Sequence, residues 1–167
     1  IEAALQEHRI DLGLVEGISR LPNLKYTTFL QDELVAVVHT GNKLSLPDEI
    51  TPEDLSRIPL VLRERGSGTL DVFERALSGH NIKLSSLNVL LYLGSTESIK
   101  LFLEHTDCMG IVSIRSVYKE LVAGNFRVVE IKGMPMQREF NFVQLQGQEG
   151  GLSQAFMRFA GHHSKSL

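Results

Sequence analysis

At 167 residues, of which 43% are apolar, the chain can bury a sizeable core as one domain or two small lobes, and no apolar run is long enough to span a membrane. Its 17 basic residues, against 20 acidic ones, are scattered and leave a net charge of −3, which argues against a nucleic-acid-binding surface. One cysteine, Cys108, excludes an internal disulfide framework and fits a reducing compartment, so we expect a cytoplasmic protein.

The first part of the chain predicts a short helix followed by strands. The apolar spacing of residues 1–5 is helical but no capping residue precedes it, so we expect that a preceding element is missing. Alternation over residues 10–16 predicts a strand that ends at Glu16-Gly17. Two extended segments follow, at residues 24–30 and 33–38, and the second is expected to be largely buried.

Residues 59–77 predict a buried strand, a glycine-serine-threonine loop and an amphipathic helix. Gly66 and Gly68 end the strand with a freedom in φ that other residues lack. Ser67 or Thr69 then caps the helix, as helices require anyway. The same hydroxyls and the backbone N–H groups at the positive helix end also suit a carboxylate, phosphate or sulfate, and both interpretations stay open.

The later elements alternate between strands and helices. Residues 87–93 predict a second buried strand, and Ser95 is the expected cap of the helix after it. Further strands are expected at residues 109–113 and 126–131, and a last helix at residues 152–159.

The order of elements between residues 59 and 113 is strand–helix–strand–helix–strand, which implies parallel crossovers in a sheet covered on both faces. Extended segments near residues 33–38 and 138–145 bracket this block without helices of their own. Such an insertion is typical of a two-lobed protein with a hinge. Its cleft would lie at the carboxyl ends of strands, together with the glycine-serine-threonine loop, Glu16-Gly17 and Ser113.

No catalytic or metal-binding constellation is recognised. The six histidines show no metal-ligand spacing, and Ser67 lacks the GxSxG context of a nucleophile. His105, Asp107 and Cys108 cluster before a strand, where an ordinary loop is favoured over a metal site. A small α/β enzyme would need an acid–base or nucleophile pair, so we expect no enzyme, no metal and no cofactor.

Several motifs in order resemble the effector-binding domain of LysR-type transcriptional regulators, in the subgroup related to regulators of sulfur and carbon assimilation. They are DLGLVEG at 11–17, DELVAVV at 32–38, LRERGSGT at 62–69 and GSTESIK at 94–100, with later matches GIVS at 110–113 and REF at 138–140.

The resemblance implies an α/β fold like the type II periplasmic binding proteins, with two lobes joined by two crossing strands. Residues 1–36 and 142–167 would form the first lobe, and residues 37–141 the inserted second lobe. The family pattern has a strand, a helix and a strand before the helix at Ile1, so the first lobe is expected to be incomplete at its N-terminus. DNA would be bound only by a helix-turn-helix domain upstream, and the chain would not bind a membrane.

The resemblance also implies a small-molecule effector in the cleft between the lobes. Its contacts would be Ser67, Gly68 and Thr69 from the second lobe, Glu16 and Gly17 from the first, and Ser113. The face of the helix at 96–104 that carries Thr96, Ile99, Lys100 and Leu103 would form a dimer interface, with a tetramer in the full-length protein.

The class of ligand stays open between two possibilities. Helix N-termini favour an anion, whereas Glu16 would favour a zwitterion or a metabolite with a donor group. A transport-linked solute-binding protein of the same architecture is the alternative function. An upstream signal peptide or lipobox would favour transport, and an upstream helix-turn-helix would favour a regulator.

Overall fold

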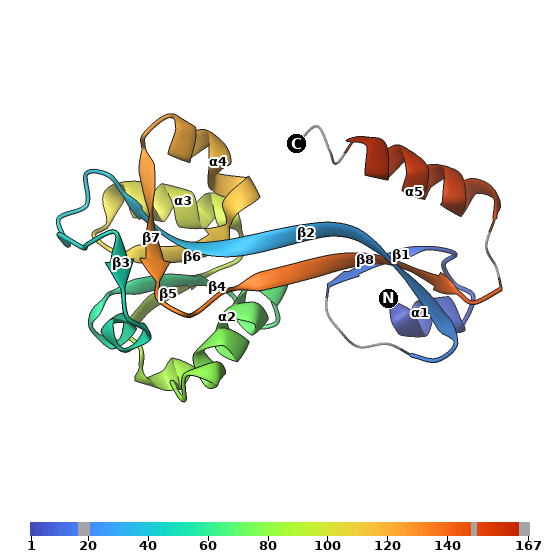
Figure 1. The fold of residues 1–167 in the computed structure, drawn as a ribbon, viewed down its shortest axis with the longest axis horizontal. Coiled ribbons are helices and arrows are strands. Elements are labelled where there is room, and N and C mark those ends of the chain that lie inside the picture. Colours follow the sequence, from blue (N-terminus) through green and yellow to red (C-terminus); the bar gives the residue numbers. More distant parts are fainter. Residues whose placement is uncertain (17–20, 148–149, 164–167) are drawn as a thin grey trace. The chain divides into compact units, whose positions relative to one another are not determined.

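The computed structural model describes residues 1–16, 21–147 and 150–163. The chain forms two compact units, which we call the first unit (Ile1–Asp32 with Arg138–Leu167) and the second unit (Glu33–Gln137). Both connections between the units run through strands, β2 (Leu24–His39) and β8 (Gln137–Leu145) (Figure 1). The second unit is therefore an insertion between two strands, as predicted.

A mixed sheet with strand order β5-β4-β6-β2-β7-β3 forms the centre of the second unit. The bounds of these strands, besides β2, are β3 (Glu49–Ile50), β4 (Leu60–Arg63), β5 (Val89–Leu93), β6 (Met109–Ser113) and β7 (Phe126–Ile131). Strand β4 is parallel to β5 and β6, which confirms the predicted crossovers, and β2 is antiparallel to β6 and β7.

Helices cover both faces of this sheet (Figure 1). They are η1 (Pro52–Arg57), α2 (Gly68–Gly79), η2 (Leu84–Ser86), α3 (Thr96–His105) and α4 (Ile114–Val122), where η marks a 3₁₀ helix. Phe73 and Leu77 bury the apolar face of α2 in one core, and Ile99, Leu103 and Val117 bury α3 and α4 in a second core on the opposite face. The apolar periodicity of each helix thus decides which face it covers.

The first unit is built on β1 (Gly13–Glu16), β8 and the N-terminal part of β2, with β8 in the middle. Helix α1 (Glu2–Gln6) contributes Leu5 to a small core with Leu24 and Val143. Helix α5 (Gly151–His163) contacts the strands through Phe156, whose ring lies 6.2 Å from that of Phe142.

Two predictions about strands were wrong. Residues 24–30 and 33–38 are not separate segments but parts of the single strand β2, because no glycine or proline interrupts the chain between them. Strand β5 was expected to be buried, yet Leu90 and Leu91 are exposed. Since β5 pairs only with β4 within the described part of the chain, it lies at the sheet edge, where one flank is open.

Candidate functional site

Three helices of the second unit begin at the same edge of its sheet. Because β4, β5 and β6 are parallel, their carboxyl ends share one edge, and α2, α3 and α4 start directly beyond those ends. A serine precedes each helix, namely Ser67, Ser95 and Ser113. The partial positive charges of three helix N-termini therefore gather at this edge, which favours a negatively charged ligand there.

The loop before α2 has the geometry of a capped helix start. Gly66 adopts a φ of 86°, a conformation that side chains disfavour, and the Leu70 N–H donates a hydrogen bond of 3.2 Å to Ser67 Oγ. The predicted capping role of Ser67 is confirmed. Capping uses Ser67 Oγ as an acceptor, and no acceptor for its own hydroxyl proton is found among the described residues. Capping and anion binding by Ser67 are thus compatible.

Gly68 and Thr69 are the first residues of α2, and they differ in which of their polar groups is open to a ligand. The Asp71 N–H donates to the Ser67 carbonyl at 3.1 Å, whereas the Gly68 N–H has no acceptor within the ranges that the structure describes. Only 8% of Thr69 is exposed, so its hydroxyl is largely covered. The backbone of this loop, more than the threonine side chain, faces outward.

The strand end before this loop carries a closed ion pair. Arg63 Nε and Nη2 donate to the two carboxylate oxygens of Glu64 at 2.7 and 2.9 Å. The hydrogen bonds from Arg63 lower the pKa of Glu64, and the partnership raises the pKa of Arg63. Because the two charges compensate each other, this strand end adds no net charge to the helix N-terminus.

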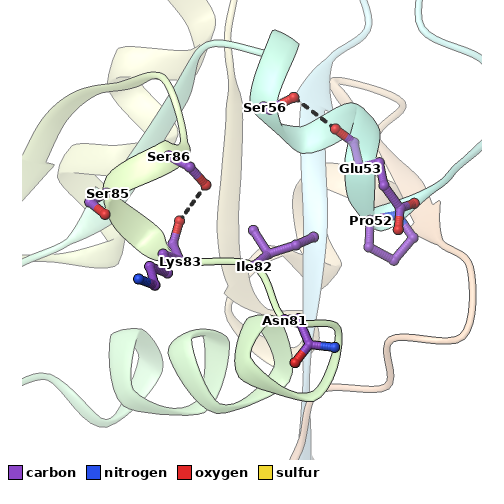
Figure 2. A pocket seen from close by; sticks show the side chains of 8 residues that line it. All are labelled: Pro52, Glu53, Ser56, Asn81, Ile82, Lys83, Ser85 and Ser86. Carbon is purple, nitrogen blue, oxygen red and sulfur yellow. Dashed lines mark hydrogen bonds between the residues drawn. The ribbon is translucent and has the colours of Figure 1, made fainter.

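Two hollows of about 450 Å³ lie in the second unit. One borders the loop before α2 through Arg65 and Gly66, and so offers space beside the predicted site. The other lies between η1 and η2, which precede β4 and β5, and contains none of the predicted residues. There the hydroxyls of Ser56 and Ser86 donate to the carbonyls of Glu53 and Lys83 (Figure 2).

In the first unit, Glu16 lies in an ion cluster that the sequence did not reveal. Its Oε2 is 3.3 Å from Arg138 Nη1, and Arg138 also contacts Asp32. The neighbouring Gly17 lies outside the described residues. Both Asp32 and Arg138 belong to motifs quoted above, but a contact across 106 positions leaves no local signal in a single sequence.

The face of α3 that was predicted for a dimer interface points into the second unit. Ile99 and Leu103 are fully buried in the core below α3, and Thr96 is half-buried. Lys100 is buried as well, with its Nζ 2.6 Å from Glu120 Oε1 on α4. Side chains in these positions are covered by their own unit.

Cys108 is a buried residue in the core of the second unit. It is fully buried, and burial together with the nearby Asp107 raises the pKa of its thiol to about 11. Among the described residues there is no cluster of His, Cys, Asp and Glu that could hold a metal ion. Within the same ranges, no helix has the length and apolar content needed to cross a membrane.

The sequence was compared with protein families and known proteins. The family model described as "LysR substrate binding domain" matches residues 1–165. A protein of Anaeromyxobacter dehalogenans named "Phosphonates import ATP-binding protein PhnC" is 30% identical, covering 96% of this chain and 32% of that protein. The "Uncharacterized HTH-type transcriptional regulator YeiE" of Escherichia coli K12 is 29% identical, covering 93% of this chain and 51% of that protein.

The fold was compared with solved structures. The regulatory domain of Synechocystis PCC6803 CcmR, in complex with 2-PG, superimposes with a TM-score of 0.79, at 23% identity, covering 99% of this chain and 79% of that one. This likeness confirms the predicted two-lobed fold of the LysR regulatory domains. The chain spans about half the length of YeiE and a third of PhnC. Because the family model matches nearly the whole chain, the chain belongs to the LysR substrate-binding domain family.

Proposed function

We propose that the chain is the ligand-sensing part of a LysR-type transcriptional regulator that works in the cytoplasm and binds DNA through a separate helix-turn-helix domain. Its family membership and the HTH-type regulator YeiE among its relatives support this function. They do not support the transport-linked alternative. The import protein PhnC matches over only a third of its own length. The role is to bind a ligand and not to convert it.

The observation that carries this proposal is the convergence of three helix N-termini on one sheet edge of the second unit. We propose that a small anionic metabolite binds there, with Ser67 donating its hydroxyl proton and the Gly68 N–H donating from the backbone. Thr69 and Ser113, from the same edge, complete the contacts. Glu16 and Gly17 are the contacts proposed for the first unit. The complex of CcmR with 2-PG shows that a domain of this fold can hold a small molecule.

Thermal unfolding in the presence of inorganic phosphate, sulfate, citrate, 2-PG or serine tests the function. A ligand at about 100 times its Kd adds about 2.7 kcal/mol and raises Tm by roughly 5–10 °C. Ser67→Ala should lower that rise by half or more.

Ser95→Ala is the matched control, because Ser95 caps α3 as Ser67 caps α2, with the Ser98 N–H donating to its Oγ at 3.1 Å. Both variants should lose about 1 kcal/mol of stability, since each loses one cap. Only Ser67→Ala should lose the ligand effect. An equal rise in Tm in the wild type and both variants would contradict the site. No rise with any of the five compounds would contradict the function.

We propose that two copies associate through the outer face of α3 and the neighbouring edge strand β5, and that a tetramer forms in the full-length protein. The side chains that face inward pack α3 against the rest of the second unit; they are Thr96, Ile99, Lys100 and Leu103. On the outer side, Leu101 is 60% exposed, and Leu90 and Leu91 are exposed on β5. Exposed leucines on adjoining elements are typical of a surface that binds another protein molecule.

Replacing Leu101 by glutamate should weaken self-association at least about tenfold, because a charge would enter an apolar contact. Analytical ultracentrifugation measures this effect. Tyr118→Glu is the control, since Tyr118 on α4 is 61% exposed and lies outside the proposed surface. If both variants weakened association alike, or neither did, the surface would be misplaced.

A further inference from the structure

Arg138 contacts a carboxylate on each of the two strands that flank its own. Strand β8 lies between β1 and β2 in the first unit. Arg138 Nε and Nη2 lie 2.8 and 2.7 Å from Asp32 Oδ2 on β2, and Nη1 lies 3.3 Å from Glu16 Oε2 on β1. One guanidinium therefore joins β1, β8 and β2, by a geometry that only the planar fork of arginine allows.

This cluster is removed from solvent. The side chains of Arg138, Asp32 and Glu16 are 12%, 2% and 17% exposed. The ring of Phe140, two residues further along β8, lies 4.8 Å from Arg138 Cζ and covers the guanidinium from one side. Among the described residues, Glu16 Oε1 is buried without a hydrogen-bond partner, and Arg138 donates to Glu16 Oε2. Arg138 thus places a compensating positive charge beside both carboxylates inside the unit.

The cluster lies at the border between the two units. Asp32 is the last residue of the first unit on β2, and Arg138 is the first residue of that unit on β8. On the other side of the border, the Leu34 N–H donates to the Met136 carbonyl at 2.9 Å. The Asp32–Arg138 ion pair and the Leu34–Met136 hydrogen bond are therefore separated by one residue on each strand. These residues are Glu33 on β2 and Gln137 on β8.

We propose that Arg138 is a positioning residue of the effector response. It holds β1, β8 and β2 as a rigid block up to the border, so that a change of angle between the units is confined to Glu33 and Gln137. Without Arg138, its link between β1, β8 and β2 would be lost, and motion would spread into the first unit. The inference rests on the proposed sensing function, because it describes how a ligand signal would pass between the units.

The test measures the distance distribution between nitroxide labels on Thr27→Cys in the first unit and Glu74→Cys in the second, by electron–electron double resonance. Because Cys108 is buried and burial raises the pKa of its thiol, we expect it not to take up the label in the folded chain. In Arg138→Met the distribution should become roughly twice as wide, because the constraint on the strands is lost. Arg9→Met is the matched control, since the Arg9–Glu7 pair in the same unit is exposed, and it should leave the width unchanged.

Arg138→Lys keeps the positive charge but not the forked guanidinium, so the distance distribution should have an intermediate width. This variant also provides a test if Arg138→Met fails to fold. Circular dichroism establishes which variants are folded. A folded Arg138→Met or Arg138→Lys with the wild-type width would overturn the inference. Because the measurement uses the free protein, its result is independent of the ligand panel. Failure of the panel would contradict the proposed function, and an unchanged width would contradict only the role of Arg138.

Discussion

Phe73→Ala should lower the free energy of unfolding of the second unit by about 3–5 kcal/mol, because a fully buried ring is lost and a cavity remains. Phe73 fixes α2 to the sheet together with Leu70 and Leu77. The helix that carries the proposed anion site is thus held mainly by this core. Urea unfolding followed by circular dichroism measures the loss.

Phe159→Ala is the matched control, because Phe159 on α5 is largely exposed. It should change the free energy of unfolding by less than about 1 kcal/mol. A loss below about 1 kcal/mol for Phe73→Ala would mean that α2 is held by other contacts. Helix α2 would then not be a rigid support for the proposed site.

Lys100→Met should lower the free energy of unfolding by about 2 kcal/mol at neutral pH. This value lies between the stability lost when an exposed ion pair is broken and that lost when a fully buried ion pair is broken. Lys100 Nζ lies 2.6 Å from Glu120 Oε1 and 2.8 Å from Glu97 Oε1, and it donates to the Ser116 carbonyl at 3.2 Å. It therefore joins α3 to α4. Methionine keeps the length of the side chain but leaves Glu120 without its cation.

The pH dependence of this loss follows from the two pKa shifts. Burial opposes the charge of Lys100, but its hydrogen bonds to Glu120 and Glu97 raise the pKa of Lys100 overall. The hydrogen bond from Lys100 lowers the pKa of Glu120. The lowered pKa adds stability above the ordinary glutamate value of 4.5, which is lost as the pH falls through the folded pKa. The raised pKa adds stability below 10.5, which is lost as the pH rises through the folded pKa.

Urea unfolding of wild type and Lys100→Met at several pH values should therefore show the largest difference near neutral pH and a smaller one below about pH 4.5. Lys132→Met is the control, because the Lys132–Glu49 pair has an N–O distance of 3.9 Å and is exposed on both sides. It should change stability by less than about 0.5 kcal/mol. A difference that does not depend on pH would show that Lys100 acts through packing alone.

The elements between β4 and β6 could be predicted because local patterns determine them. The apolar run of β4, the glycine at φ 86° and the helical spacing of α2 each point to the same local structure. The strand at 109–113 and the cap at Ser67 followed from the same kind of signal. The order of these elements between two bracketing strands indicated a two-lobed arrangement, and the family resemblance then supported it.

Features that depend on contacts between distant residues could not be predicted. An apolar strand looks the same at a sheet edge as in the middle, so the exposure of Leu90 and Leu91 was missed. The mixture of apolar and charged residues on one face of α3 does not reveal the pairing of Lys100 with Glu120, which lies 20 positions away. The contact of Arg138 with Asp32 likewise arises only from the pairing of β8 with β2.

The most direct test of the central claim is an amide-resolved NMR titration with inorganic phosphate and with 2-PG. If the sheet edge of the second unit is the ligand site, one of these compounds should shift the amide signals of Gly68, Thr69 and Leu70 most strongly, because their N–H groups lie at the start of α2. Shifts confined to the pocket of Figure 2, around Ser56 and Ile82, would contradict this account. Saturable binding without any shift at Gly68 to Leu70 would contradict it equally.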